Sequence, residues 1–435
     1  MLRAVVVFVN IFFIASNFFS KDGNILYLSL EEAINLSVKN NLDIKKEDIN
    51  LKDKKIALYS SFNKFYPDLS LSSSINSGYD FNKETADNSI RAGFSLSLSL
   101  SAKIIYDIRD LYLDYYIGKV AYDKTRASAL KNLKLAYFNI VLIDEEINIK
   151  EKALKNAEAR YNKSLIQYKE GEISELDILN EEYSYKSILP DLVAMKNNRE
   201  NVVNLFKIIL GIPLESSIAL TDVIPTDISL EIPDLDNNLI ENNLIENNFD
   251  IQNLNLKIEK DKNSQYINIA SLTPSVRLSY SVNAGSIKDP FIERWNNENW
   301  NGSTSLGFTV SIPIKPALPF SSEQVSLIKS DSVIKKTIID LEIEKNNKRV
   351  ELTTILLKLK QVGETLEALR LNIDIAEKIS KLTENSYYEG TKSFLEVAES
   401  QKNAEEAKLK YNKSLYDYYK GVVEIEFLLN ESIVK

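Results

Sequence analysis

The residues of this sequence that could carry chemistry are carboxylates, and the pair Glu396 and Glu399 is the clearest case. Their spacing of three residues puts both side chains on one face of a helix, where two acids could act as general acid and general base. The chain has no histidine and no cysteine, which removes imidazole catalysis, thiolate chemistry, disulfides and zinc sites made of those residues. A carboxylate enzyme is therefore a poor interpretation. The alternative interpretation of this pair is that both glutamates simply lie on a solvent-exposed face of a helix.

The composition is that of a folded chain with long, uninterrupted elements. It has 435 residues, of which 44% are apolar and 26% charged, enough for two or three ordinary domains. The formal net charge of −9 argues against a nucleic-acid partner. Glycine and proline are scarce, at 12 and 10 residues, so we expect long helices and strands.

The N-terminal segment differs from the rest. Arg3 precedes a run from 4 to 19 that is apolar apart from two asparagines and one serine. This pattern is typical of a secretory signal peptide, here residues 1–20, and is too short to span a bilayer comfortably. An uncleaved membrane anchor is the alternative. No second apolar run of about 20 residues follows, so we expect no transmembrane helix.

Two short polar breaks share one pattern. Residues 168–179 read YKEGEISELDIL and residues 387–398 read YYEGTKSFLEVA, and their glycines, Gly171 and Gly390, are 219 residues apart. Each glycine lies between two long charged stretches of helical periodicity, and it supplies the backbone freedom of a tight reversal. A lone glycine would indicate an ordinary turn. The repetition at fixed spacing predicts two helical hairpins, with tips near 171 and 390.

The elements around these tips occur twice in the same order, as helix, strand, strand, long helix, tip and return helix. In repeat 1, residues 21–211, a helix starts at a capping box at Ser29, and the other expected elements are strands 68–77 and 90–101 and helices 103–168 and 175–210. In repeat 2, residues 238–435, they are a first helix, strands 275–284 and 303–313, a helix from 322 to 387 and a return helix to about 430. A connector, residues 212–237, joins the repeats. Pro190 is expected to kink or break the first return helix.

The long helices and the strands each have a periodicity that indicates their packing. Apolar residues recur mostly at seven-residue steps in both long helices, which predicts coiled-coil seams. The two rows are Leu133, Ile140, Ile147, Leu154, Tyr161 and Tyr168, and Leu352, Leu359, Leu366, Ile373, Ser380 and Tyr387. The strands alternate apolar residues with serines and other small polar ones. The second strand has about the 9–11 residues that a tilted strand needs to cross a bilayer. A soluble sandwich would also alternate, but a serine face suits a water-filled lumen better.

Four membrane-length strands cannot close a barrel alone, because small membrane barrels start at about eight strands. Open sheet edges in lipid leave backbone groups unpaired, at several kcal/mol each. Chains must therefore share one barrel. Two copies give little lumen, whereas three give twelve strands and room for a channel. Four helical columns per chain likewise give twelve in a trimer, enough to wall a hollow cylinder about 100 Å long.

With this repeat, these strand pairs and the tip pattern Gly-x-x-x-x-Leu-Asp/Glu at 171–177 and 390–396, the chain resembles the TolC-type outer-membrane factors. The resemblance covers nearly everything after residue 20. It implies an α+β membrane protein that forms a homotrimer, with a 12-stranded β-barrel continued by a 12-helix α-barrel. The implied location is the outer membrane, with a long periplasmic extension.

The resemblance also implies a function. Such a duct is passive, has no cofactor and no catalytic residue, and serves as the exit of a tripartite drug-efflux pump or a type I secretion system. A periplasmic adaptor, or membrane fusion protein, opens it, and an inner-membrane transporter supplies the energy. The tip residues that match the adaptor-docking positions are Gly171, Glu172, Gly390 and Thr391.

The remaining matches concern a gate. The family closes its aperture by links between the two hairpins. At the matching positions of this sequence, these links would join Tyr387 and Lys392 of the second hairpin to Asp177 of the first. Lysine stands where the family often has arginine, so the link is expected to be looser. The acidic rings of the family fall on Glu396 and Glu399, and such a ring favours cations.

The residues assigned to the gate also have simpler structural interpretations. The Lys392–Asp177 link could be an exposed ion pair that contributes well under about 1 kcal/mol. Tyr387 could serve in seam packing only. The alternative for the whole chain is a surface-anchored structural or adhesive coiled coil without a pore, which gives the serine-faced strands no role.

Overall fold

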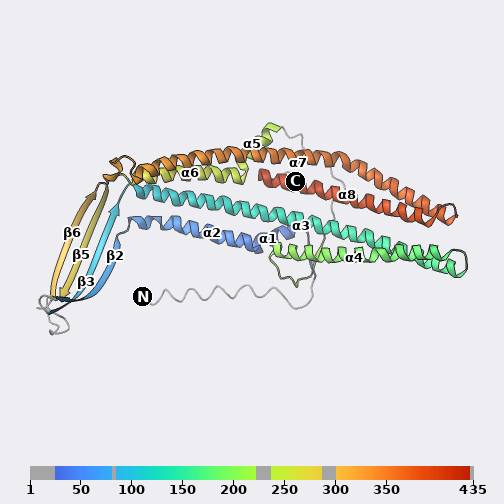
Figure 1. Ribbon diagram of the computed structural model, residues 1–435, viewed down its shortest axis with the longest axis horizontal. Coiled ribbons are helices and arrows are strands. Elements are labelled where there is room, and N and C mark those ends of the chain that lie inside the picture. Colours follow the sequence, from blue (N-terminus) through green and yellow to red (C-terminus); the bar gives the residue numbers. More distant parts are fainter. Residues whose placement is uncertain (1–24, 81–84, 222–236, 287–299, 432–435) are drawn as a thin grey trace. The chain divides into compact units, whose positions relative to one another are not determined.

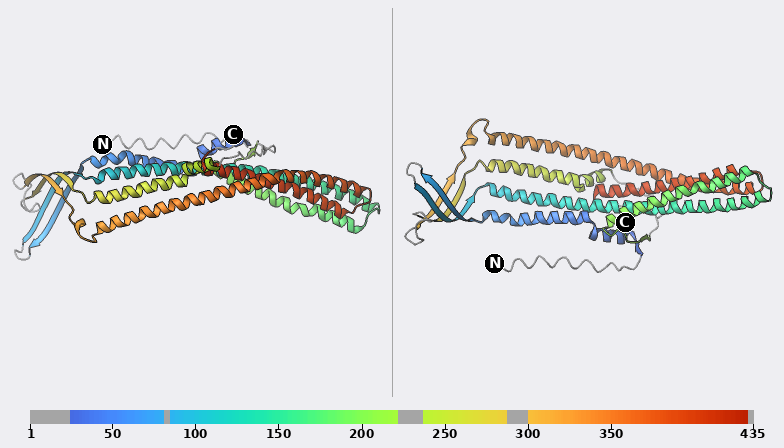
Figure 2. Two further views of the ribbon diagram at one scale, coloured as in Figure 1. Left: turned by 90° about the horizontal axis from the view of Figure 1, so that it is seen from above. Right: turned by 60° about the horizontal axis from the view of Figure 1, so that its bottom comes forward.

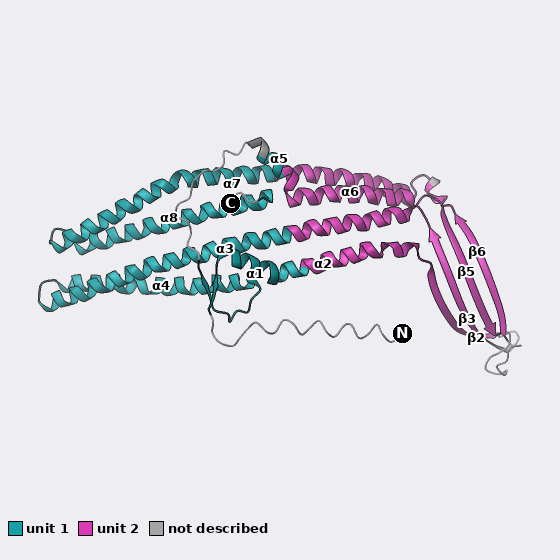
Figure 3. Cartoon of the chain, turned by 180° about the vertical axis from the view of Figure 1, so that it is seen from behind, with its two compact units in different colours: residues 1–46, 124–244, 348–435 teal, residues 47–123, 245–347 magenta. Residues whose placement is uncertain are grey.

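The structure is a computed structural model that describes residues 25–80, 85–221, 237–286 and 300–431 (Figure 1). The predicted signal peptide and most of the predicted connector lie outside these ranges. The chain forms two compact units, coloured in Figure 3: unit 1 takes residues 1–46, 124–244 and 348–435, and unit 2 takes 47–123 and 245–347. Each unit therefore draws on both halves of the sequence.

The α-helices and the four long strands follow the same order in both described halves of the chain. The first half has β1 (Leu26–Leu28), α1 (Leu30–Asn40), α2 (Leu42–Tyr59), the 3-10 helix η1 (Ser60–Phe65), β2 (Asp68–Asp80), β3 (Thr85–Leu100), α3 (Lys103–Lys169), α4 (Glu175–Leu210) and β4 (Ile218–Leu220). The second has α5 (Asn237–Asn247), α6 (Phe249–Ala270), β5 (Ser275–Ser286), β6 (Trp300–Ser311), the 3-10 helix η3 (Lys315–Ala317), α7 (Ser322–Tyr388) and α8 (Phe394–Leu429).

The long elements agree closely in length between the halves. Helices α3 and α7 have 67 residues each, and α4 and α8 have 36 each. The β-strands β2, β3 and β5 extend beyond the expected ranges by two to five residues at one end, and β6 starts three residues before its expected range and ends two residues before its end. Helix α4 runs through Pro190 without interruption, so the break considered there does not occur.

Unit 2 contains a four-stranded antiparallel sheet in the order β2-β3-β5-β6. The central pair joins the two halves of the sequence, with Arg91 opposite Gly285 at one end and Leu100 opposite Val276 at the other. Two hairpin pairs flank it, β2 with β3 and β5 with β6. One edge of β2 and one edge of β6 therefore have no partner strand within the described chain.

The two faces of this sheet differ in crowding. On the hydroxyl face, Ser70 Oγ is 2.6 Å from Ser95 Oγ and Ser281 Oγ is 2.8 Å from Ser305 Oγ. A Cβ added at Gly93 would lie 2.6 Å from Asn283 Oδ1, so a larger residue there would require the Asn283 side chain to move. The apolar face is open by contrast, with Leu71 at 86% and Leu306 at 81% exposure.

The helical part of unit 2 is held by polar contacts between α6 and its neighbours. Lys260 of α6 forms ion pairs with Asp110 and Asp114 of α3, and Arg109 pairs with Glu259 at 3.2 Å. Asn268 Nδ2 donates to Ser330 Oγ of α7 at 2.8 Å. These contacts fix α6 beside both long helices.

The core of unit 1 follows the seven-residue rows. Leu133 and Ile140 of α3 are fully buried, packed with Phe206 and Leu210 of α4. In the second half, Leu352, Leu359 and Leu366 of α7 pack against Leu415, Tyr418, Ile425, Leu428 and Leu429 of α8. None of the described helices is long and apolar enough to cross a membrane.

Candidate gate at the hairpin tips

Both hairpin tips end their first helix in the same way. Gly171 has φ +78° and Gly390 has φ +75°, in the left-handed region that favours glycine. In the first tip, the Gly171 N–H donates to the Tyr168 carbonyl and the Glu172 N–H to the Gln167 carbonyl, at 3.0 and 2.8 Å. The second tip has the equivalent bonds, 3.0 Å from Gly390 and 2.9 Å from Thr391. This is a Schellman motif, which satisfies the last carbonyls of the helix.

The return helices also begin alike, with a capping box. Ser174 Oγ accepts from the Asp177 N–H, and Asp177 Oδ2 accepts from the Ser174 N–H at 3.1 Å. Ser393 and Glu396 repeat this exchange in the second tip, with 2.8 Å from the Ser393 N–H to Glu396 Oε2. Two of the acidic residues that the family resemblance assigned to a gate, Asp177 and Glu396, therefore hold helix starts in the single chain.

Lys392 and Asp177 are not brought together within the chain. Lys392 Nζ lies 2.5 Å from Glu396 Oε1, one turn along its own hairpin. Donation from Lys392, and then from the Ser393 N–H, lowers the pKa of Glu396 to about 2. Glu396 is therefore anionic at any physiological pH. Glu399 lies exposed, three residues further on.

Tyr387 and its neighbour Tyr388 do reach the first hairpin, which lies beside the second in unit 1 (Figure 2). Burial, and then the Glu181 carboxylate, raise the pKa of Tyr387, while a hydrogen bond with Ser164 acts in the opposite direction. The Lys163 ammonium lies 3.6 Å from the centre of the Tyr388 ring, within range of a cation–π interaction. The two tyrosines thus link the hairpins about one turn from the tip.

Behind these tyrosines lies a buried ion pair that sequence reasoning missed. Arg160 Nε of α3 is 3.5 Å from Glu181 Oε2 of α4, and the side chains are 8% and 1% exposed. Neither carboxylate oxygen has a hydrogen-bond partner among the described residues. Burial raises the pKa of Glu181 to about 7, although Arg160 opposes the shift. Arg160 lies eleven residues before Gly171, and Glu181 lies ten residues after it. This nearly equal spacing from the turn was the sequence signal that could have placed the two side chains at the same level of the hairpin.

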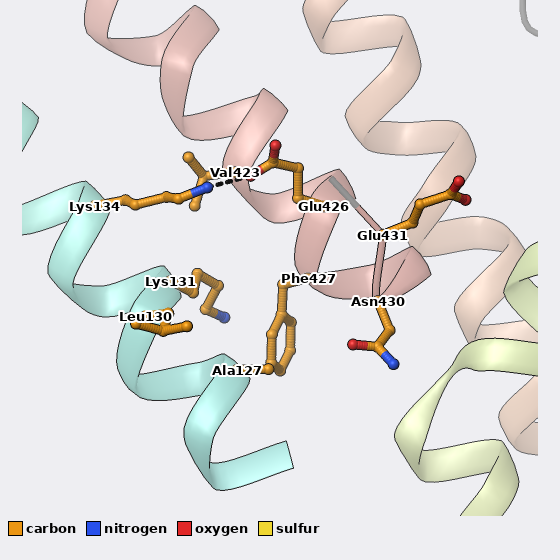
Figure 4. Close-up of a pocket in the computed structure, with 9 residues that line it drawn as sticks. All are labelled: Ala127, Leu130, Lys131, Lys134, Val423, Glu426, Phe427, Asn430 and Glu431. Carbon is orange, nitrogen blue, oxygen red and sulfur yellow. Dashed lines mark hydrogen bonds and ion pairs between the residues drawn. The ribbon is translucent and has the colours of Figure 1, made fainter. Parts of the chain in front are cut away.

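A groove in unit 1, between α3 and the end of α8, has a volume of about 210 Å³ (Figure 4). Its two lysines already have partners. Lys134 Nζ is 2.6 Å from Glu426 Oε2, and Lys131 Nζ lies 4.2 Å from the centre of the Phe427 ring. The groove is therefore a packing feature that ties the two halves of the sequence together.

The fold has clear relatives among solved structures. CusC, solved for conformational changes that accompany folding and transmembrane channel formation, is 15% identical at a TM-score of 0.78, over 95% of each chain. The Campylobacter jejuni CmeC outer membrane channel is 17% identical at 0.75, over 93% of this chain and 87% of that one. The open state of the Neisseria gonorrhoeae MtrE outer membrane channel is 15% identical at 0.73, over 93% and 89%.

No protein-family model matches the sequence, and no curated protein matches it either. The likeness to the solved channels nevertheless extends over nearly the whole chain. The chain therefore has the fold of the TolC-type outer-membrane channels, as its repeated strands and hairpin tips predicted.

Proposed function

We propose that three copies of this chain close a twelve-stranded β-barrel in an outer membrane. The observation that carries the proposal is the open sheet of four strands, each 12 to 16 residues long, with one exposed apolar face. Its two edges have no partner strand within the described chain, and unpaired backbone groups in lipid cost several kcal/mol each. A copy on either side supplies the missing partners.

The helices support a shared wall in the same way. Apolar residues stay exposed in short rows on α2 and α7 of unit 2, over Ile49, Ile56, Tyr59, Ile339 and Ile343. Unit 1 has similar rows on α4 and α7, over Leu176, Leu179, Tyr183, Leu371, Ile375 and Leu382. Helical faces of this kind are normally buried against another helix. Packing against the neighbouring copies buries them and gives an α-barrel of twelve helices.

The assembled trimer is the passive exit duct of a tripartite efflux pump or a type I secretion system. It stands in the outer membrane, with its helical part in the periplasm, and it catalyses no reaction. Each of the repeats, residues 21–211 and 238–435, supplies half of one copy's wall, and the connector over 212–237 joins them. The solved relatives, described as outer membrane channels, support this assignment.

The hairpin tips form the periplasmic entrance. Gly171, Glu172, Gly390 and Thr391 meet the adaptor, because all four are exposed and a Cβ at either glycine would have nothing within 4 Å. Glu396 and Glu399 ring the aperture with six carboxylates in a trimer. Lys392, Asp177 and Tyr387 hold it closed, with Lys392 reaching a neighbouring copy's tip when it leaves its local pair with Glu396.

Single-channel recording in a planar bilayer tests this function. The purified trimer is expected to conduct, with a low baseline current that rises when Lys392→Gln weakens the closed entrance. Lys402→Gln is the matched control, because Lys402 also makes an exposed pair one turn along α8, with Glu406 at 3.7 Å. A rise in both variants would argue against a gate at Lys392. A trimer that never conducts would contradict the duct.

The chain's lack of cysteine gives a clean background for testing the barrel. Single cysteines placed along β2, each combined with Ser305→Cys in β6, are expected to form crosslinks between copies at one register. Cysteines placed in β3 and β5 are the control, since those strands already pair with each other within one chain. Crosslinking only within a chain at every position would exclude the shared barrel.

A further inference from the structure

The two edge strands of the sheet differ from the two central strands in the segments that join them to the helices. The segments beside the central strands, 101–102 after β3 and 271–274 before β5, expose no large apolar side chain. The segments beside the edge strands are 60–67, before β2, and 312–321, after β6, and both do. Their exposed apolar side chains are Phe62, Phe65, Tyr66, Ile312, Ile314, Leu318 and Phe320.

Both of these segments lie at the same end of the sheet. Asp68, the first residue of β2, pairs with Ser97 near the end of β3, and Ser311, the last residue of β6, pairs with Ser275, the first residue of β5. The end of β3 and the start of β5 pair with each other in turn. The helices of unit 2 join the sheet at this end, which we call its helical end (Figure 1). One apolar segment therefore stands beside each free edge, at the helical end.

Hydrogen bonds hold the segment after β6 in one conformation. Gln324 Nε2 of α7 donates to the Pro316 carbonyl at 2.9 Å. The Ser321 N–H donates to the Leu318 carbonyl at 3.2 Å. These two bonds enclose Phe320, so the direction of its side chain is set by the backbone on both sides.

Phe320 combines an unfavourable backbone conformation with an exposed aromatic ring. Its φ is +58°, and only one other described residue apart from glycine has a positive φ. The left-handed region is unfavourable for a residue with a bulky side chain. The side chain is nevertheless 89% exposed, so no contact within its own chain offsets the strain. A strained residue that presents a large apolar group to solvent indicates a surface that binds something else.

We propose that Phe320 packs against the aromatic side chains of segment 60–67 in the neighbouring copy, so that an apolar contact closes each junction between copies at the helical end of the barrel. The inference rests on the proposed function, which places the β6 edge of one copy beside the β2 edge of the next. The aromatic side chains of that segment are Phe62, Phe65 and Tyr66.

The strand directions bring the two segments together. At the helical end β2 begins and β6 ends, so the two strands run antiparallel across the junction, and the segments beside them meet at one level. A closed ring of identical copies needs two different surfaces that fit each other. The segments beside the two free edges supply such surfaces.

Lipid is the other environment that could cover these side chains, because aromatic residues gather where membrane barrels meet the bilayer surface. Lipid, however, surrounds the whole circumference of a barrel. It gives no reason for the exposed side chains to be absent from 101–102 and 271–274, which would meet the same lipid. Confinement to the two edges therefore favours a second copy.

Crosslinking between copies tests the contact in a chain that has no cysteine of its own. Phe320→Cys is combined in turn with Phe62→Cys, Phe65→Cys and Tyr66→Cys, and at least one pair is expected to join copies covalently on oxidation. Phe320→Cys with Ser101→Cys is the control, since Ser101 lies beside a central strand, and it is expected to give no crosslink. Crosslinks between β2 and β6 of different copies without any at the three aromatic pairs would overturn the inference and leave the barrel intact. The absence of both kinds would contradict the barrel, and the inference with it.

Glycine at position 320 separates a contact between copies from strain within one chain. Phe320→Gly removes the left-handed strain, so a chain that makes no such contact gains or keeps stability. The proposed contact predicts the opposite, a downward shift in the temperature at which the trimer dissociates in detergent. Asn430→Gly is the matched control, because Asn430 is the other described residue with a positive φ, at +50°, and belongs to neither segment; it is expected to cause no downward shift. A dissociation temperature that does not fall in Phe320→Gly would overturn the inference.

A nitroxide spin label on Phe320→Cys distinguishes a protein contact from lipid. In the reconstituted trimer, oxygen dissolved in the bilayer and a water-soluble nickel complex are both expected to reach this label poorly. A label on Leu306→Cys is the reference for lipid, since Leu306 is exposed on the apolar face of β6. Oxygen access at 320 equal to that at 306 would assign Phe320 to lipid and overturn the inference, as would free access of the nickel complex.

Discussion

The two helical hairpins are alike at their tips and different ten residues behind them. Each tip combines a left-handed glycine with a capping box. At the fixed spacing of 219 residues, however, Arg160 and Glu181 of the first hairpin correspond to Ile379 and Ser400 of the second. Ile379 is half exposed and Ser400 is buried with its hydroxyl on the Val397 carbonyl. Only the first hairpin therefore has a buried ion pair at this level.

The difference extends to the surfaces by which the hairpins meet. Lys163, which lies against the Tyr388 ring, corresponds to the exposed Leu382. Tyr388 in turn corresponds to Lys169. A cationic surface on one hairpin and an aromatic one on the other can bind each other, whereas two identical surfaces would not be complementary in this way. The two tips therefore have the same turn, whereas the helical segments behind them carry different residues that contact each other.

The largest expected effect comes from removing the arginine of the buried pair. Arg160→Leu leaves the Glu181 carboxylate buried without a cation, and loss of one partner of such a pair costs about 3 kcal/mol or more. The thermal unfolding temperature of the purified protein in detergent is therefore expected to fall. The loss is greater at pH 8 than at pH 5.5, because a protonated Glu181 does not need the cation.

The second hairpin supplies the control for this variant. The double change Arg160→Ile with Glu181→Ser reproduces the residues at 379 and 400, and it removes both charges together. It is expected to recover most of the lost stability, as replaced buried ion pairs often do. If the double variant is as unstable as Arg160→Leu, packing rather than the unpaired carboxylate explains the loss.

A smaller effect is expected from pH alone. The folded-state pKa of Glu181 is about 7, raised from 4.5, so the folded hairpin binds a proton that the unfolded chain releases between these values. The free energy of unfolding therefore falls as pH rises from about 4.5 to about 7, by at most about 3 kcal/mol. Hydrogen exchange of α4 around Glu181, corrected for the intrinsic rate, is expected to show less protection at pH 8 than at pH 5.5.

Two comparisons isolate the titrating group. Glu181→Gln cannot release a proton and is expected to remove this pH dependence. The equivalent segment of α8 around Ser400 serves as a control within the same molecule, because Ile379 and Ser400 carry no charge. A pH dependence that is equal in both hairpins would point to a group other than Glu181.

The sequence predicted the features that depend on local chemistry. Strand alternation, the seven-residue rows and the glycine at each tip are set by neighbours a few residues away, and the structure has them. The pairing of Lys392 with Glu396 follows from a spacing of four on one helix, but the family resemblance directed attention to Asp177 instead. Arg160 and Glu181 could not be assigned from periodicity, since their burial depends on how two hairpins pack.

The smallest expected effect comes from the tip glycines. Alanine at Gly171 or Gly390 meets open space, because a Cβ at either position has nothing within 4 Å. The cost is then the left-handed backbone alone, about 1–2 kcal/mol for each tip. Gly302→Ala is the control, since it also meets open space but lacks a positive φ. Thermal unfolding of the three variants checks the order.

Equal losses at the two tips are expected, because the Schellman bonds and the capping boxes are equivalent in geometry. Unequal losses would show that something beyond the local turn acts on one tip. In the proposed trimer that additional contact would come from a neighbouring copy, because a Cβ at either tip glycine has nothing within 4 Å in its own chain. The tip with the greater loss of stability would then be the one that holds the entrance closed. The two tips would in that case share a turn geometry but differ in their role.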